Sequence, residues 1–264
     1  MLSERFASLR AANRRALVCY VTAGYPDRAK SIALLRGLVG AGADVLEVGV
    51  PFSDPVADGP IIQGSSQRAL EQGMTLDGAL ELVAEAKLAV PVVLFSYLNP
   101  ILAAGPEVLE RARSAGVHGV LVTDLPVGAD AAREAWFGAG PLDFVRLVAP
   151  TTPKARMAEI AAHGRGFVYL ISRLGVTGMR DDLDPALPET IARLRAVCAL
   201  PICVGFGVSR PDHARRAGAL ADGVVVGSAL VQAAERSVEE AVALARGLRR
   251  ALDERRPEQR EGAA

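Results

Sequence analysis

The sequence predicts an α/β protein that folds as a single (β/α)8 TIM barrel. Short apolar runs, rich in β-branched residues, recur eight times along the chain, and stretches with helical spacing separate them. Continuous apolar runs are typical of parallel strands buried on both faces, which need crossover connections. The 264 residues also match the length of about 250 residues that eight βα units require. An open, doubly wound sheet is the alternative, because counting strands does not prove that the sheet closes.

Each predicted strand is a short apolar run that ends at or near a small or polar residue. The runs ALVCYVTA and DVLEVGV, the first two, show the pattern. A run of this kind between turn residues is typical of a fully buried strand. The eight predicted strands are residues 16–23, 44–50, 91–97, 119–124, 143–149, 166–172, 201–206 and 222–227.

The segments between the strands carry apolar residues on one side, as amphipathic helices do. Leu76, Leu80 and Val83 form one such stripe, and Thr75 is the type of residue that begins a helix. The segment AGAD at 41–44 predicts a helix that ends near a glycine just before the next strand. These signals place helices between the predicted strands.

The chain shows no linker and no shift in composition that would divide it. We expect one domain over residues 1–264. Residues 1–15 are expected to form an N-terminal helix. Residues 253–264 are polar and contain Pro257, so a frayed tail is expected there.

The composition argues against several classes of partner. Thirty basic residues balance thirty acidic ones, so no basic surface for nucleic acid is expected. The longest apolar stretch, residues 88–95, is far shorter than the roughly 18 residues of a membrane span. The first residues lack the apolar run of a secretory signal, and three cysteines without a CxxC pair do not build a disulfide framework. We therefore expect a cytoplasmic protein that binds neither nucleic acid nor membrane.

Glu47 is the most informative residue, because it is a carboxylate within the apolar run of the second strand. Burying an ionised carboxylate is costly unless it is paired or protonated. One interpretation is an ion pair with an arginine near the rim of the barrel. The functional interpretation is a general acid/base whose pKa is raised by the apolar wall. The loop that follows, residues 51–60, is rich in proline and adds two more carboxylates, Asp54 and Asp58.

Glycines gather where three of the last strands end. They occur in the segments SRLGVTG at 172–178, GFGVS at 205–209 and GS at 227–228. Glycines allow backbone N–H groups to approach a ligand closely, and a helix that starts after 227–228 would direct its N-terminus at an anion. Many barrels of this fold bind phosphate in this place, so the three clusters together predict a phosphate site.

The positions of the lysines and histidines exclude further kinds of catalysis. Lys30, Lys87 and Lys154 are the three lysines, all in predicted helical segments, so a Schiff-base lysine at a strand end is not expected. Structural or surface roles are expected for the histidines, His118, His163 and His213. No metal site and no cofactor are predicted. The remaining chemistry is carboxylate acid/base catalysis on a phosphorylated substrate.

Several blocks of the sequence carry a family resemblance. They are LEVGVPFSDPVADGPIIQ at 46–63, APTTP at 149–153, FVYLISRLGVTG at 167–178, GFGVS at 205–209 and ADGVVVGSALVQ at 221–232, together with YVTAGYP at 20–26 and YLNP at 97–100. With these blocks in their order along the chain, the sequence resembles the tryptophan synthase alpha subunit family over about residues 5–250. The first block is highly specific, whereas GFG and VGS occur in many barrels that bind phosphate.

The resemblance implies a lyase of tryptophan biosynthesis that cleaves indole-3-glycerol phosphate to indole and glyceraldehyde 3-phosphate by a retro-aldol reaction. The indole ring serves as the electron sink once its C3 is protonated, so the family needs neither metal nor cofactor. By resemblance, Glu47 is the principal acid/base, Asp58 holds the indole N–H, and Tyr169 lines the same site. Tyr20, Phe95 and Leu121 are expected to line the indole pocket.

The resemblance also assigns the phosphate end of the substrate and a mobile lid. The implied phosphate-binding positions are Gly178, Gly207, Gly227 and Ser228. Thr177 matches a lid residue that orients Asp58 when residues 173–184 close over the site. Closure of such a lid excludes water from the acid/base pair.

A partner is implied as well, because the family's alpha subunit docks on a pyridoxal-phosphate beta subunit in an alpha2beta2 heterotetramer. The loops near 52–60, 97–105 and 173–184 are expected to face it. The alternatives are a standalone indole-releasing lyase, another phosphate-binding barrel enzyme, and a regulatory subunit with little turnover. Arg146 is unusual within a strand; an ion pair at the barrel rim is one interpretation, and the sequence leaves its role open.

Overall fold

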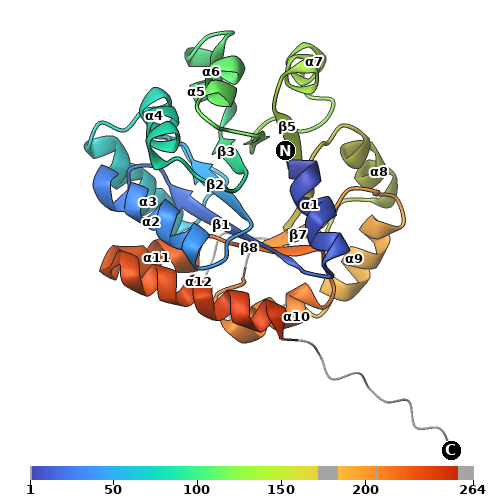
Figure 1. Cartoon of the computed structure of the whole chain (residues 1–264). Helices are drawn as coiled ribbons and strands as arrows, with labels where there is room; N and C mark the ends of the chain where they lie inside the picture. Colours follow the sequence, from blue (N-terminus) through green and yellow to red (C-terminus); the bar gives the residue numbers. More distant parts are fainter. Residues whose placement is uncertain (1, 172–183, 206, 255–264) are drawn as a thin grey trace, which may run out of the picture.

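Eight parallel strands close into a barrel in the order of the sequence, and helices surround it (Figure 1). The computed structural model describes residues 2–171, 184–205 and 207–254. The strands are β1 (Ala16–Thr22), β2 (Val45–Gly49), β3 (Val92–Ser96), β4 (Gly119–Val122), β5 (Asp143–Val148), β6 (Val168–Ile171), β7 (Ile202–Gly205) and β8 (Gly223–Val226). Because β1 pairs with both β2 and β8, the predicted barrel is confirmed and the open sheet is wrong.

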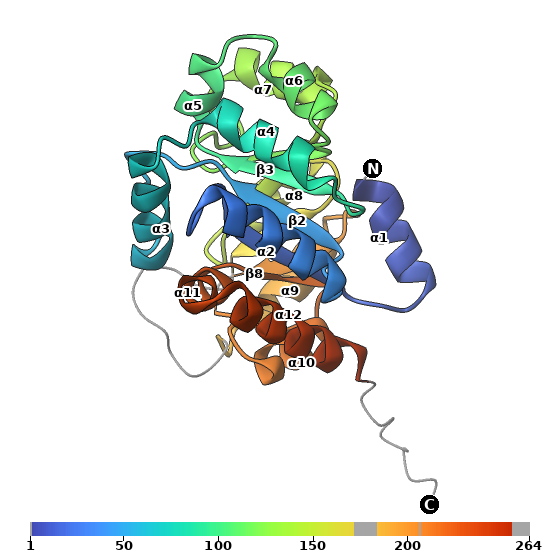
Figure 2. The same ribbon diagram turned by 60° about the vertical axis from the view of Figure 1, so that its left-hand side comes forward.

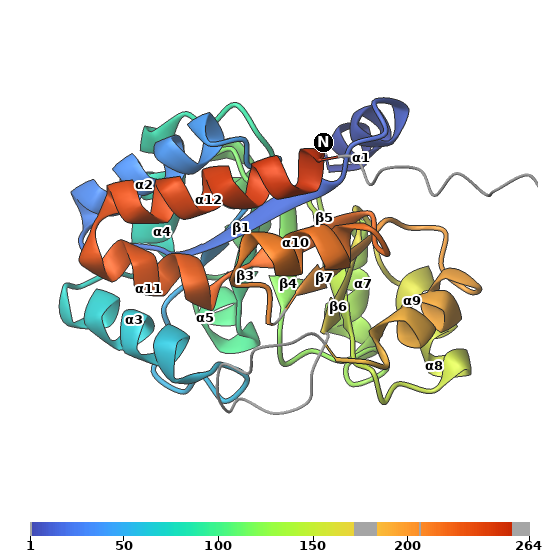
Figure 3. The same ribbon diagram turned by 90° about the horizontal axis from the view of Figure 1, so that it is seen from below.

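Twelve helices are described around the barrel and at its end. They are α1 (Leu2–Ala11), α2 (Arg28–Gly40), α3 (Pro60–Glu71), α4 (Leu76–Ala86), α5 (Leu98–Ala103), α6 (Val108–Ser114), α7 (Ala131–Ala139), α8 (Lys154–Ala162), α9 (Leu187–Arg195), α10 (Pro211–Gly218), α11 (Ser228–Arg236) and α12 (Val238–Asp253). The start predicted at Thr75 is confirmed, since its Oγ1 accepts a hydrogen bond from the Gly78 N–H at 3.1 Å. Figure 3 shows α11 and α12 side by side along β1.

Each strand lies inside its predicted range and is shorter by a residue or two at an end. Backbone pairing fades gradually there: the Ala23 N–H still donates to the Gly49 carbonyl at 2.9 Å, one residue beyond β1. The N-terminal helix predicted over 1–15 is also shorter, ending at Ala11. Asn13 explains the early end, because its φ of +50° is incompatible with a continuing right-handed helix. Lys87 likewise follows α4 at φ +48° rather than lying within a helix.

Side chains alternate between the barrel interior and the layer under the helices. On β2, Val45 belongs to the interior cluster, whereas Leu46 and Val48 pack in the outer cluster with the helices. Glu47 has the parity of Val45 and therefore points into the barrel. Its neighbours in register are Tyr20 on β1 and Val93 on β3. The strand pattern thus places the predicted acid/base inside the barrel.

Helix α1 closes the amino end of the barrel. It stands apart from the surrounding helices in Figure 2, and its buried residues Leu2, Phe6 and Leu9 belong to the interior cluster. The rings of Phe6 and Phe167 contact each other with centroids 5.4 Å apart. A helix packed into this end leaves the carboxyl ends of the strands for ligand binding.

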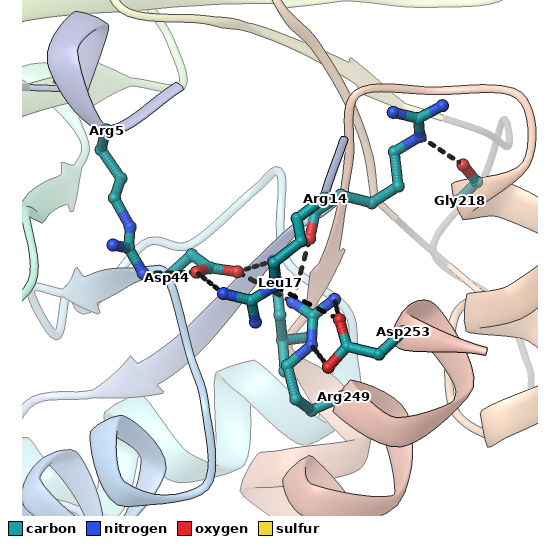
Figure 4. A network of polar contacts seen from close by, with 8 residues as sticks. Arg5, Arg14, Leu17, Asp44, Gly218, Arg249 and Asp253 are labelled. Atoms are coloured by element: carbon teal, nitrogen blue, oxygen red, sulfur yellow. Dashed lines mark hydrogen bonds and ion pairs between the residues drawn. The ribbon is translucent and has the colours of Figure 1, made fainter. Parts of the chain in front are cut away.

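Asp44 ties α1 to the rest of the barrel just before β2 (Figure 4). Its side chain is almost fully buried and accepts hydrogen bonds from the Leu17 N–H and from Nη1 of Arg249, both at 2.9 Å. Nη2 of Arg5, on α1, lies 2.5 Å from Asp44 Oδ1. Arg249 in turn pairs with Asp253, so the network joins α1, β1 and α12. In the described part of the chain, no helix is long and apolar enough to span a membrane.

Candidate active site

Glu47 is a buried carboxyl group with no partner. Its side chain is 1% exposed, and neither Oε1 nor Oε2 has a hydrogen-bond partner among the described residues. No arginine of the described segments pairs with it, so the ion-pair interpretation is wrong. Burial raises the pKa of Glu47 to about 8, because the apolar interior disfavours the charged form. The group is therefore protonated at neutral pH and can donate a proton.

Asp58 lies in the loop between β2 and α3, and Tyr97 holds its carboxylate. Tyr97 donates its hydroxyl proton to Asp58 Oδ2 at 3.0 Å, and the same hydroxyl accepts a hydrogen bond from the Ala57 N–H at 2.9 Å. Burial raises the pKa of Asp58 to about 6, while the hydrogen bond from Tyr97 lowers it. At pH 7 the site thus holds an ionised Asp58 and a protonated Glu47. Two carboxyl groups in opposite protonation states suit separate roles in acid/base catalysis.

Tyr97 is a residue that sequence reasoning missed. In the sequence it is part of the YLNP motif, to which no separate role of Tyr97 was assigned. The available signal was a residue with a hydroxyl group directly after β3, at the end of the barrel where ligands bind. Its contact with Asp58 depends on how the loop after β2 folds, which no local pattern specifies.

The hydroxyls of Tyr20 and Tyr169 each lie over a glycine of the neighbouring strand, which makes room for them. A Cβ at Gly49 would lie 2.0 Å from Tyr20 Oη, and a Cβ at Gly205 would lie 2.0 Å from Tyr169 Oη. Gly205 therefore serves tyrosine packing, although the sequence grouped it with the phosphate glycines. Burial, together with the nearby carboxylates, raises the pKa of both tyrosines well above their usual value. Both hydroxyls stay neutral and can only donate or accept hydrogen bonds.

The residues predicted for the indole pocket form an apolar wall near Glu47. Tyr20 and Phe95 contact edge to face, with ring centroids 5.3 Å apart. Leu121 pairs in register with Phe95 and is fully buried in the interior cluster. Phe95, in contrast, is partly exposed.

The described phosphate candidates lie at the ends of β7 and β8. Gly207 is exposed and has φ +89°, a conformation that favours glycine. Gly227 precedes α11, and its carbonyl accepts from the N–H groups of Leu230 and Val231. Ser228, the first residue of α11, is exposed. Of the other predicted residues, Gly178, Thr177 and the lid at 173–183 lie outside the described residues.

Arg146, whose role the sequence left open, has a buried ion-pair partner in Glu134. Its Nη2 lies 2.7 Å from Glu134 Oε2, and its guanidinium packs 4.0 Å over the Phe144 ring. Phe144 belongs to the outer cluster, so the pair lies between β5 and α7 and not at the barrel rim. Nη1 of Arg146 donates to the Leu125 carbonyl at 3.2 Å, and Glu134 Oε1 accepts from the Gly128 N–H at 2.6 Å. The pair supports the loop between β4 and α7.

No group of His, Cys, Asp or Glu in the described segments could hold a metal ion. Cys19, Cys198 and Cys203 are free and buried. Acid/base groups, neutral tyrosines and an apolar wall therefore make up the described site. Such a site can exchange protons with an aromatic ligand.

Comparison with known proteins identifies the family. The family model described as tryptophan synthase alpha chain matches residues 6–256. The chain belongs to the tryptophan synthase alpha chain family. This confirms the resemblance seen in the sequence, and it makes the chain a carbon–carbon lyase of tryptophan biosynthesis, as predicted.

Similar proteins span almost the whole chain. The tryptophan synthase alpha chain of Laribacter hongkongensis is 46% identical over 261 residues, covering 96% of this chain and 98% of the relative. The tryptophan synthase alpha chain of Desulfatibacillum aliphaticivorans is 46% identical over 241 residues, covering 90% of this chain and 91% of the relative. A structure of Mycobacterium tuberculosis tryptophan synthase superimposes with a TM-score of 0.88 at 37% identity, covering 95% of this chain and 97% of that one.

Proposed function

We propose that this chain cleaves indole-3-glycerol phosphate to indole and glyceraldehyde 3-phosphate, with Glu47 as the acid/base. The observation that supports this assignment is the unpaired Glu47 carboxyl group, buried beside an aromatic wall. A protonated acid in an apolar site can transfer its proton to carbon without competition from water. Nothing in the geometry favours the standalone lyase over the alpha subunit, which family membership supports.

The proton balance of the reaction fits one carboxyl group that acts twice. Glu47 donates its proton to C3 of the indole ring, which creates an indolenine cation. The resulting carboxylate removes the proton from the hydroxyl on the glycerol carbon attached to the ring. As that O–H bond breaks, the C–C bond breaks too, its electron pair returns to the ring, and the aldehyde forms. Glu47 ends the cycle protonated, as its pKa of about 8 requires at neutral pH.

Asp58 and Tyr169 complete the indole end of the site. The ionised Asp58 accepts a hydrogen bond from the indole N–H and stabilises the positive charge that develops on the ring. Tyr97 fixes one carboxylate oxygen of Asp58, which leaves the other oxygen for the substrate. Tyr169 lines the site with a neutral hydroxyl, and Tyr20, Phe95 and Leu121 enclose the ring.

The phosphate end lies at the last three strands. We assign phosphate binding to Gly178, Gly207, Gly227 and Ser228. The first turn of α11 supports this assignment, since unpaired N–H groups at a helix N-terminus attract anions. Thr177 is assigned to a lid at 173–184 that orients Asp58 on closing. We assign one domain to the whole chain, residues 1–264, and a cytoplasmic location.

A beta subunit is the proposed partner, in an alpha2beta2 assembly. The loop at 52–60 and the segment at 97–105 lie at the carboxyl end of the barrel, where a product would leave. A loop was expected over 97–105, but most of this segment forms α5. The loop and the segment each expose a large apolar side chain, Val56 at 81% and Leu102 at 38%. Family membership supports this partner, since the chain is similar to a solved structure of a tryptophan synthase.

The test is an indole-release assay on the chain alone and with a tryptophan synthase beta subunit. We expect slow release from the isolated chain and at least tenfold faster release in the complex. Fast release without any partner would support the standalone lyase instead. No release in either case would reject the proposed function.

A further inference from the structure

His213 is a buried histidine that lies behind the loop after β7. It is the third residue of α10 and is 1% exposed. Its imidazole faces back to that loop: Nδ1 lies 2.9 Å from the Gly207 carbonyl oxygen, and Nε2 lies 2.9 Å from Nη2 of Arg210. Ser209 Oγ lies 3.5 Å from Nδ1. The mechanism above does not use this ring.

The neighbours of the ring determine its tautomer. A guanidinium group only donates hydrogen bonds, so Nε2 must accept from Arg210. The neutral imidazole then carries its proton on Nδ1, where the acceptor is the Gly207 carbonyl. Arg210, His213 and Gly207 therefore form one directed chain of hydrogen bonds, from the guanidinium to the backbone.

This chain ends on the residue with the most conformational freedom in the loop. Gly207 is exposed and lies at φ +89°, and a glycine loses more entropy than any other residue when it is fixed. A part-buried hydrogen bond to its carbonyl restricts the peptide from the protein side. The opposite side of Gly207 remains open to solvent and to a ligand.

We propose that His213 is a positioning residue for the phosphate end of the substrate. It holds the Gly207 carbonyl from behind, so that the backbone of this loop is already in place when the phosphate arrives. Fixing a binding loop in advance lowers the entropy cost of binding. The inference rests on the proposed function, in which Gly207 binds phosphate, and it adds a residue for which the sequence predicted only a structural or surface role.

The test compares His213→Leu with His213→Asn. Leucine removes the donor, whereas the Asn side-chain amide can place an N–H near the position of Nδ1. We expect His213→Leu to weaken glycerol 3-phosphate binding about fivefold to tenfold, which is the size of one lost hydrogen bond, and to raise KM for indole-3-glycerol phosphate by a similar factor. Indole affinity and kcat should stay within about twofold of wild type, and His213→Asn should recover most of the loss. His163→Leu, an exposed histidine beyond α8, is the matched control.

Two outcomes would overturn the proposal: unchanged glycerol 3-phosphate affinity in a folded His213→Leu variant, or an equal loss of indole affinity. If the leucine variant does not fold, His213→Asn and His213→Gln decide, because the Gln amide reaches the position of Nε2 and not that of Nδ1. If His213→Gln binds glycerol 3-phosphate as tightly as His213→Asn or more tightly, the assigned contact is contradicted. A wild-type chain that binds glycerol 3-phosphate but releases no indole would reject the proposed function and leave this test intact.

Discussion

At the scale of single residues, the site depends on two carboxyl groups in opposite protonation states. Burial without a partner keeps Glu47 protonated, with a pKa of about 8. Asp58 has a hydroxyl donor and partial exposure, and its pKa is about 6. The difference comes from one contact, the hydrogen bond from Tyr97, and from the depth of each group in the barrel.

These protonation states predict a bell-shaped pH dependence of kcat/KM. Activity should rise through about pH 6 as Asp58 loses its proton, and fall through about pH 8 as Glu47 loses its proton. Tyr97→Phe removes the donor that favours ionised Asp58, so the lower limb should move to higher pH by about one to two units and kcat/KM at pH 7 should fall about twofold to tenfold. Tyr25→Phe is the control, because Tyr25 is also buried and its ring contacts Arg68 rather than Asp58. An unmoved lower limb in Tyr97→Phe would contradict the role of this hydroxyl.

Stability should respond to the pH through Glu47 as well. The folded chain keeps this proton up to about pH 8, whereas the unfolded chain releases it near the ordinary pKa of 4.5. The stabilisation is therefore complete below pH 4.5 and is lost as pH rises through 8, by about 5 kcal/mol in total. Glu47→Gln carries no proton to lose, so its free energy of unfolding in urea should exceed that of wild type at pH 8.5 and approach it at pH 5. A difference that does not change with pH would contradict the raised pKa; Glu85→Gln, at an exposed pair, is the control.

At the scale of elements, a buried ion pair fixes the loop between β4 and α7. Arg146 and Glu134 each also bind backbone of this loop, at the Leu125 carbonyl and the Gly128 N–H. The loop begins where β4 ends, and Asp124 Oδ1 in it accepts from the Leu98 N–H at 2.7 Å. The pair thus indirectly supports the segment that contains Tyr97.

Removal of one member should cost more than removal of both. Arg146→Met leaves Glu134 buried without its main partner, so the free energy of unfolding should fall by about 3–5 kcal/mol. Adding Glu134→Gln should recover most of this loss, since the amide oxygen can still accept from Gly128. Urea unfolding of the single and the double variant measures both free energies. Arg236→Met, at an exposed pair, should change stability by less than about 1 kcal/mol, and an equally small effect of Arg146→Met would show that the buried pair contributes little.

At the scale of the whole molecule, the two ends of the barrel have separate tasks. The amino end is filled by α1 and fastened through Asp44, Arg5 and Arg249. The carboxyl end has the loops and the proposed acid/base groups. Catalysis at the carboxyl end and packing at the amino end is the usual division in this fold. Mutations at one end can therefore leave the other unaffected.

Asp44→Asn tests this separation. The amide loses the ion pairs with Arg249 and Arg5, so the free energy of unfolding should fall by about 3 kcal/mol. Well below the unfolding temperature, kcat and KM should stay within about twofold of wild type. Asp212→Asn, at an exposed pair, is the stability control. A large change in KM in the folded variant would contradict the separation of the two ends.

The sequence predicts the barrel well because eight apolar runs with helices between them permit few other arrangements. It also indicates Glu47, since a carboxylate within a buried strand needs an explanation. It does not predict the contacts of Tyr97 with Asp58, of Tyr169 with the space over Gly205, or of Asp44 with Arg249. Each joins residues far apart in the chain, 205 positions in the last case. Such contacts depend on closure of the barrel and on loop conformations, which no local pattern contains.

The most direct measurement is the turnover of Glu47→Gln, because glutamine keeps the shape of the protonated acid but can neither give nor take the proton. We predict that kcat for indole release falls by about a thousandfold, within the range that general acid–base groups supply, while the affinities for indole and glycerol 3-phosphate stay as in wild type. Turnover within a few-fold of wild type would contradict the account.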